Sequence, residues 1–389
     1  MKYTLLLAAC IALVQAAPLL APSNNAKPIP DSYIVVLKDG HSAASFQPAF
    51  DSIAKRQNGR GVKPKVHRQY KAIPGFHASL PPAALKEIQA RSEVAYVEQD
   101  AVMKIYGQQD SPPSWGLTRV SEQDLDLSQP YSYNDAAGQG ITAYIVDTGV
   151  YAEHKEFGGR AKLAANFVDG SADTDENGHG THVSGTIGGS TYGVAKKVSI
   201  VGVKVLDAQG SGSTSGVVAG MDWVAQNAKP GKSVVNMSLG GGKSQAIDDA
   251  AGRLFSANIP LIVAAGNDET VDACDGSPSG APNTLTVAAS DKTDNTASFT
   301  SWGSCVEIFG PGVDITSSWI GSSDASNTIS GTSMATPHVV GVAALYLSQG
   351  GLNSAQDLFD KLTSTATPDH IQGSLKGSPN KLVYNGGAK

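Results

Sequence analysis

Short apolar runs alternate with longer mixed segments over most of the chain, and this pattern predicts its secondary structure. Runs rich in Val, Ile, Leu and Ala have the length of buried strands, whereas apolar residues three or four apart indicate helices. We expect strands at 141–146, 199–205, 233–238, 260–264 and 285–289, and helices at 179–188, 214–228, 245–257 and 333–347. Such alternation predicts an α/β fold in which helices cover both faces of a parallel sheet.

The first hundred residues follow a different pattern. Lys2 precedes an apolar run from Leu5 to Val14, which is typical of a signal peptide, and we expect cleavage after Ala16. Strands at 32–38 and 94–100 and a helix at 83–91 then form a small α+β unit. The polar segment 104–113 is expected to be a linker. The predicted division is therefore a signal peptide at 1–16, a small domain at 17–107 and a large domain at 108–389.

Charge separates the same two domains. The whole chain has a net charge of −6, but residues 17–107 contain 12 Lys and Arg against 7 Asp and Glu, and residues 108–389 contain 16 against 28. Opposite net charges favour association of the two parts. The basic stretch 55–71 lacks interleaved aromatic residues, so we do not expect nucleic-acid binding. No other run is long enough to span a bilayer, and we expect a secreted protein that does not bind membranes.

Three polar residues stand where the predicted elements begin or end. Asp147 follows the strand 141–146, His179 opens a helix between glycines, and Ser333 opens the apolar helix 333–347. In open parallel sheets, active sites lie at the carboxyl ends of the strands. A serine at a helix N-terminus also lies near free backbone N–H groups that can stabilise an oxyanion. This pattern indicates an Asp-His-Ser catalytic triad.

Each of these residues also has an ordinary structural interpretation. An aspartate after a strand is often a turn residue, and a serine before a helix is often an N-cap. His179 and His182 could form a metal pair, but no His-Glu-x-x-His pattern surrounds them, and His182 is better interpreted as a packed neighbour. The three residues together, in the chain order Asp, His, Ser, favour catalysis.

Asn267 is a fourth candidate. It follows the strand 260–264 and a Gly, where a turn asparagine would be ordinary. Beside a serine nucleophile, its amide could donate a hydrogen bond to the oxyanion together with the Ser333 N–H. We expect this role for Asn267 because the other three residues are present.

These motifs resemble those of subtilisin-like serine proteases, in particular the proteinase K-like branch and its secreted fungal alkaline proteases. The resemblance covers essentially the whole chain. It extends to further matching stretches at 115–117, 192–197, 202–207, 238–242 and 308–312. It implies that residues 32–101 fold as an inhibitory prosegment and that residues 108–389 form a subtilisin-like catalytic domain.

The resemblance also implies how a substrate binds. Glycine-rich segments of the family pair with an extended peptide through main-chain hydrogen bonds. The small or uncharged residues expected to line this site are Gly210, Ser211, Gly212, Ser238, Leu239, Gly240, Gly241, Ala264 and Gly266, with a further wall at 277–280. A pocket without a buried charge should accept apolar and aromatic side chains rather than Arg or Lys, provided that Asp275 is exposed.

The catalytic domain contains candidates for a disulfide bridge and for a calcium site. Cys10 is lost with the signal peptide, which leaves Cys274 and Cys305 as an even pair in an oxidising compartment. The resemblance implies a calcium site at Pro282, Thr284 and Glu307. Aspartate stands at the Glu307 position in the family, so this chain either keeps the site in altered form or lacks it.

The sequence therefore predicts a secreted serine endopeptidase made as a self-processing zymogen. Its partners would be protein and peptide substrates and its own prosegment as an inhibitor; we expect a monomer that needs no cofactor for its chemistry, with calcium in a structural role only. One alternative is a vacuolar or intracellular processing protease of the same family. Another is a catalytically silent relative that acts as a binding protein.

Overall fold

The computed structural model describes residues 16–21, 28–57, 62–70, 73–101 and 107–387. The expected signal peptide lies almost entirely outside these residues. The chain divides into two compact units, residues 1–104 and 105–389. Among the described residues, no helix combines the length and apolar character that a bilayer crossing requires.

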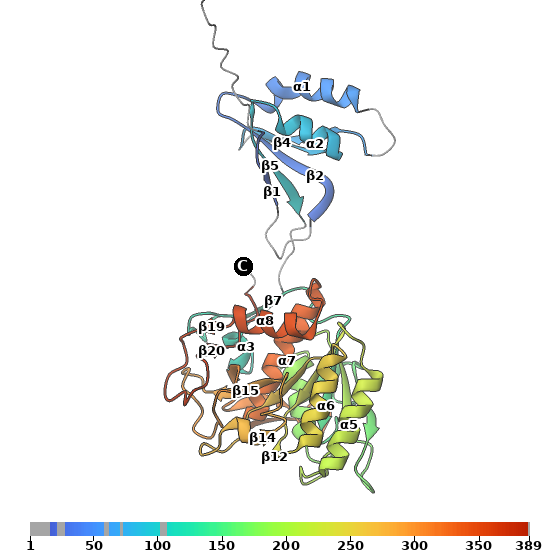
Figure 1. Ribbon diagram of the computed structural model, residues 1–389, viewed down its shortest axis with the longest axis vertical. Helices are drawn as coiled ribbons and strands as arrows, with labels where there is room; N and C mark the ends of the chain where they lie inside the picture. The colour runs from blue at the N-terminus through green and yellow to red at the C-terminus, as the bar shows by residue number, and fades with distance from the viewer. Residues whose placement is uncertain (1–15, 22–27, 58–61, 71–72, 102–106, 388–389) are drawn as a thin grey trace, which may run out of the picture. The chain divides into compact units, whose positions relative to one another are not determined.

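The first unit is a five-stranded sheet covered by two helices (Figure 1). Its sheet order is β1-β5-β2-β4-β3. The elements are β1 (Leu19–Leu20), β2 (Pro28–Leu37), α1 (Ala43–Arg56), β3 (Lys65–Gln69), β4 (Gly75–Ser79), α2 (Pro82–Gln89) and β5 (Val94–Ala101). Phe46 and Phe50 of α1 and Ile88 of α2 pack with alternate residues of β2 into one core. The expected α+β unit is present, but the sequence pattern missed β1, α1, β3 and β4.

The second unit is built on a nine-stranded sheet with the order β19-β20-β16-β15-β13-β11-β8-β10-β9. All neighbouring strands are parallel except β19 and β20. Its strands are β8 (Thr142–Asp147), β9 (Ala161–Asn166), β10 (Ser199–Lys204), β11 (Ser233–Met237), β13 (Leu261–Ala264), β15 (Leu285–Ser290), β16 (Ile308–Pro311), β19 (Thr367–Pro368) and β20 (Lys381–Leu382). The expected parallel sheet and its five expected strands are confirmed.

Helices cover both faces of this sheet, as the pattern predicts. They are α3 (Trp115–Arg119), α4 (His179–Gly188), α5 (Thr214–Asn227), α6 (Gln245–Ser256), α7 (Thr332–Gln349) and α8 (Ala355–Thr365). Consecutive residues of β8 show why both faces are buried. Ile145 belongs to the cluster under α4, α7 and α8, and Val146 belongs to the cluster under α5 and α6. Figure 1 shows α5 and α6 side by side on their face.

Part of the expected linker is instead a strand. β6 (Gly107–Gln109) pairs antiparallel with β7 (Tyr131–Tyr133), within the second unit. The Gln109 side-chain amide also donates to the carbonyl of Thr191, at 3.0 Å. A Gly-Gln-Gln strand has no alternation of apolar and polar residues, so the hydrophobic pattern cannot predict its backbone pairing. The remaining short pairs are β12 (Gly241–Gly242) with β14 (Gly276–Ser277) and β17 (Ile315–Ser318) with β18 (Ser326–Ile329).

Candidate active site

The three triad candidates come from three elements. Asp147 ends β8, His179 is the first residue of α4, and Ser333 is the second residue of α7. β8 lies between β10 and β11, and the later strands of the sheet continue from β11. A change of direction in strand order opens a crevice at the carboxyl ends of the strands, and Asp147 lies at such a point.

Asp147 and His179 are in direct contact. The Nδ1 atom of His179 lies 2.7 Å from Oδ1 of Asp147, which also accepts the Thr148 N–H at 2.7 Å. The Asp147 side chain is fully buried, whereas 24% of the His179 side chain is exposed. Burial alone would lower the pKa of His179. The charge and hydrogen bond of Asp147, with the charge of Asp175, outweigh it and leave that pKa above its usual value.

A second buried carboxylate, Asp175, organises the start of α4. It accepts five hydrogen bonds, from Thr148 Oγ1, Asn177 N, Gly178 N, Thr181 N and Thr181 Oγ1. These bonds satisfy backbone N–H groups that a helix N-terminus leaves unpaired, and they connect β8 to α4 through Thr148. Asp175 is not among the residues predicted from the sequence. Its position four residues before His179 is the signal that could have identified it as a cap.

His182 packs one turn further along α4. It is buried, and its Nε2 lies 3.0 Å from the carbonyl oxygen of Ile315. Burial lowers its pKa to about 4, so it is neutral at physiological pH. The expectation of a packed neighbour is confirmed. No group of three or more His, Cys, Asp or Glu side chains able to hold a metal ion occurs in the described ranges.

Ser333 exchanges hydrogen bonds with Ser238. The Ser333 hydroxyl donates to the Ser238 carbonyl, and the Ser238 hydroxyl donates to the Ser333 carbonyl, both at 2.9 Å. The second bond has a cause in the sequence. Pro337, four residues after Ser333, has no N–H to give to that carbonyl. α7 begins at Thr332, which places this proline in the second turn of the helix.

The amide of Asn267 has a defined orientation. Its Oδ1 accepts the backbone N–H of Thr332 at 2.8 Å and the Thr332 hydroxyl at 2.9 Å. Because the amide oxygen is occupied, the amide nitrogen is the atom left to donate. The Ser333 N–H belongs to the first turn of α7, where backbone donors have no partner within the helix. Thr332, which fixes this orientation, is not among the residues predicted from the sequence.

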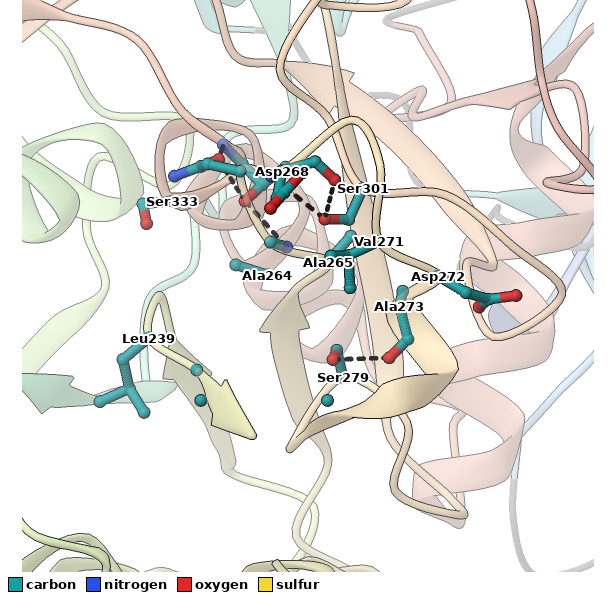
Figure 2. Close-up of a pocket in the computed structure, with 16 residues that line it drawn as sticks. Leu239, Ala264, Ala265, Asp268, Val271, Asp272, Ala273, Ser279, Ser301 and Ser333 are labelled. Atoms are coloured by element: carbon teal, nitrogen blue, oxygen red, sulfur yellow. Dashed lines mark hydrogen bonds between the residues drawn. The ribbon is translucent and has the colours of Figure 1, made fainter. Parts of the chain in front are cut away.

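A pocket of about 280 Å³ lies beside Ser333 (Figure 2). Of the expected lining residues, it contains Leu239, Gly240, Gly241, Ala264 and Gly266. Those that the sequence missed include Val271, Ala273, Gly276 and Thr332. Two carboxylates, Asp268 and Asp272, also line it, but they accept hydrogen bonds from Thr270 and from the Cys274 N–H. Asp275 is exposed, as expected.

An adjoining groove of about 570 Å³ contains the other expected residues, Gly210, Ser211, Gly212 and Ser238. His179 also lines it, and the segment 239–241 lines both cavities. The Asp207 carboxylate accepts the backbone N–H groups of Gln209 and Ser211, which closes the 207–211 turn. The two cavities therefore share one glycine-rich wall; Ser333 lines the pocket and His179 lines the groove.

The expected disulfide is present between Cys274 and Cys305, with Cα atoms 5.3 Å apart. Cys274 lies in a short 3₁₀ helix, Ala273–Asp275, whose first residue lines the pocket. The bridge therefore connects one wall of the pocket to the segment before β16.

The expected calcium residues lie between β13 and β16. The Glu307 carboxylate accepts the Thr286 N–H, and burial raises its pKa to about 8. The Thr284 hydroxyl donates to the Ala281 carbonyl at 2.9 Å. A carboxylate whose ionised form is penalised by burial is chemically suited to a divalent cation, and calcium accepts mixed carboxylate and carbonyl ligands. Glu307 with the carbonyls of Pro282 and Thr284 would form such a set.

Comparison with known proteins identifies this arrangement. Residues 138–380 match the Subtilase family, and residues 32–106 match the family described as Peptidase inhibitor I9. The chain belongs to the subtilase family. It is a serine endopeptidase with an inhibitory prosegment, and catalysis in this family requires no cofactor.

Individual relatives agree with this assignment. The chain is 46% identical to "Subtilisin-like protease 2" of Pseudogymnoascus destructans, over 98% of this chain and 97% of the relative. It is also 46% identical to "Cuticle-degrading serine protease" of Arthrobotrys oligospora, over 95% of each chain. A solved "cold adapted subtilisin-like serine proteinase" shares 50% identity and a TM-score of 0.67, covering 70% of this chain and 97% of that structure.

The Asn267→Ala variant should lower kcat by about 10²–10³ with little change in KM, because an oxyanion forms only after attack on the substrate. Steady-state kinetics on a chromogenic peptide would test this. Thr332→Val should show a smaller loss of kcat, since it removes one of the two bonds that orient the amide. A rise in KM at constant kcat for Asn267→Ala would show a ground-state binding role instead.

The pH profile should report the Asp147–His179 contact. A general base works in its neutral form, so kcat/KM should rise with pH through a midpoint above the usual histidine value of about 6.5. Asp147→Asn should move that midpoint to lower pH and reduce kcat by about 10⁴. Asp222→Asn, on an exposed face of α5, serves as the matched control. An unchanged midpoint in Asp147→Asn would contradict the pairing.

Proposed function

We propose that this subtilase hydrolyses peptide bonds through Ser333, His179 and Asp147. The observation that carries the proposal is the 2.7 Å contact of buried Asp147 with His179, at the sheet edge that also presents Ser333 and Asn267. This geometry is what an imidazole needs to accept a proton and remain stabilised as an imidazolium. It argues against a catalytically silent relative, which has no reason to keep all four groups.

Catalysis begins when a substrate carbonyl approaches Ser333. The hydroxyl leaves its hydrogen bond to the Ser238 carbonyl, gives its proton to Nε2 of His179 and attacks the carbonyl carbon. Catalytic hydrogen bonds often form only in the substrate complex, which accounts for the Ser333–Ser238 bond in the free enzyme. The oxyanion accepts hydrogen bonds from the Asn267 amide and the Ser333 N–H. His179 then protonates the leaving amine, and water repeats the sequence on the acyl-enzyme.

The two cavities define the substrate. The groove takes the residues before the scissile bond as an extended strand, along the glycine-rich segments 210–212 and 238–241. The pocket beside Ser333 takes the side chain at P1, the residue on the amino side of the cut. Its lining of alanine, glycine, leucine and valine favours apolar and aromatic side chains, with broad tolerance elsewhere because main-chain pairing carries little sequence information.

We further propose that the enzyme is secreted and acts outside the cell. The apolar segment Leu5–Val14, outside the described residues, supplies the signal, and the Cys274–Cys305 bridge suits an oxidising compartment. The pocket contains no buried charge, because Asp268 is exposed and Asp272 is only half-buried, and this favours the secreted enzyme over an intracellular processing protease specific for basic residues.

Labelling by a fluorophosphonate, combined with a series of peptides that differ only at P1, would test the activity. The wild type should be labelled once per molecule and should cleave after Phe or Leu in preference to Lys. Ser333→Ala should fold, bind peptide and show neither labelling nor turnover. Activity near that of the wild type in Ser333→Ala would show that another residue is the nucleophile.

Self-processing is proposed for the segment between the two units. Ile105 and Tyr106, which lie outside the described residues, offer the side chains that the P1 pocket should accept. β6 begins at Gly107, so a cut before it leaves the paired strand intact. The Ser333→Ala precursor should remain uncut in a host without other proteases. The free prosegment should inhibit the mature enzyme, more weakly at high salt because the parts have opposite net charges. Normal maturation of the variant would exclude self-processing.

Calcium binding is proposed at Glu307, with a structural role. Because the pKa of folded Glu307, about 8, exceeds its usual value, the protonated form stabilises the fold, and this stability is lost as pH rises through about 8. In chelator, the denaturant midpoint of a Ser333→Ala background should fall between pH 6 and pH 9, and calcium should restore it at pH 9. Adding Glu307→Gln should remove both effects. A calcium response retained in Glu307→Gln would place the ion elsewhere.

A further inference from the structure

The P1 pocket has walls made largely of glycine, serine and alanine. One wall is the segment 239–242 and the other is the turn 273–280. They are joined directly by the ladder of β12 with β14, which is only two residues long. Glycine gives a backbone more freedom than any other residue, so these walls contain little that would hold them in place. Within the turn, the Ser279 hydroxyl donates to the Ala273 carbonyl at 2.8 Å, and the Cys274–Cys305 bridge connects the turn to the segment before β16. A side chain outside the pocket adds a further support.

Lys243, the residue after β12, lies at that outer side. Its Nζ is 2.7 Å from the carbonyl oxygen of Gly280 and 3.4 Å from those of Cys274 and Gly276. It is also 3.1 Å from Oδ2 of Asp248, a carboxylate with only 6% of its side chain exposed. Lys243 lines neither cavity, whereas Gly276 lines the pocket from the other side.

These four oxygens form a cage for a cation. The turn brings its carbonyls together tightly: a Cβ on Gly280 would lie 2.2 Å from the Cys274 carbonyl oxygen. Three carbonyl dipoles and a carboxylate that point at one place repel each other unless a positive charge lies between them. The Lys243 ammonium supplies that charge and three N–H donors. Because its side chain is 47% exposed, the ion pair with Asp248 alone would contribute little, and the carbonyl contacts are the decisive feature.

Asp248 is held in place in turn. Its Oδ1 accepts the Ser277 hydroxyl at 2.6 Å, and the same Ser277 oxygen accepts the Ser244 N–H at 3.0 Å. The segment from Lys243 to Asp248 therefore contacts the 274–280 turn at three backbone carbonyls and at the side chain of Ser277. Both walls of the pocket are tied to the start of α6 by this network.

We propose that Lys243 is a positioning residue for P1 binding, acting as the resident cation of this carbonyl cage. Lys243 does not contact the substrate. It keeps the 274–280 wall far enough from the 239–242 wall for a large P1 side chain to fit between them. The inference rests on the proposed P1 role of the pocket. Without the ammonium, the turn should relax, and contact with a large P1 side chain should be lost more than contact with a small one.

The test compares two peptides that differ only in Phe or Ala at P1, with wild type, Lys243→Ala and Lys197→Ala. Lys197 is the matched control, since its Nζ also donates to a backbone carbonyl, that of Asp135, away from both cavities. In Lys243→Ala, kcat/KM for the Phe peptide should fall about tenfold through KM, a typical effect of lost pocket contacts, with the Ala peptide changed less than twofold. The Phe-to-Ala ratio does not depend on the fraction of enzyme folded.

Chemical rescue distinguishes a cation site from general loosening. Propylammonium chloride should restore the ratio in Lys243→Ala, whereas propanol and equal sodium chloride should not. An unchanged ratio, or equal rescue by propanol, would overturn the proposal. Failure of the underlying function would look different: the wild type itself would then show no preference for Phe, or no fluorophosphonate labelling, before any variant is compared.

Discussion

Helix α7 lacks one backbone hydrogen bond, at Pro337, and the geometry around Ser333 depends on how that bond is replaced. The Ser333 carbonyl accepts a hydrogen bond from the Ser238 hydroxyl in place of the missing N–H, and the Ser333 hydroxyl donates to the Ser238 carbonyl. Ser238 in turn accepts a hydrogen bond from the Asn236 side chain of β11 at 3.0 Å. Two hydrogen bonds thus join the helix that carries the proposed nucleophile to Ser238 in the wall proposed to bind substrate.

Buried carboxylates have a comparable role at the start of α4. Asp147 contacts His179 directly, while Asp175 acts on it through the backbone of the same helix turn. A buried polar group that makes several hydrogen bonds, as Asp175 does, is held rigidly, because each broken bond would leave a costly unpaired group. Here that rigidity fixes the imidazole, and the negative charge of both carboxylates favours its protonated form.

The hydrophobic pattern predicted the central strands well because they are buried on both faces and appear as unbroken apolar runs. The hydrophobic pattern failed to predict elements that lack apolar alternation or that contain a proline. β6 is paired through its backbone alone, and α1 contains Pro48, although Phe46, Phe50 and Ile53 have helical spacing. Asp147, His179, Ser333 and Asn267 could be found because motif and chain order identify them. Asp175 is not among the predicted residues, although its position before α4 is a usable signal. Thr332 and Lys243 could not be found, since their significance lies in contacts that only the folded chain creates.

The burial of α7 has a consequence for the order in which activity can arise. Every residue from Met334 to Leu347 is buried. Because the helix has no polar face, it is not stable in water until its neighbours have assembled around it. Strands from both halves of the catalytic unit must pair before it is enclosed, and such distant pairings are slow to form. A nascent or half-unfolded molecule therefore has its serine on an unformed helix. As the proposed nucleophile, Ser333 can act only once the sheet and helices that enclose α7 are assembled.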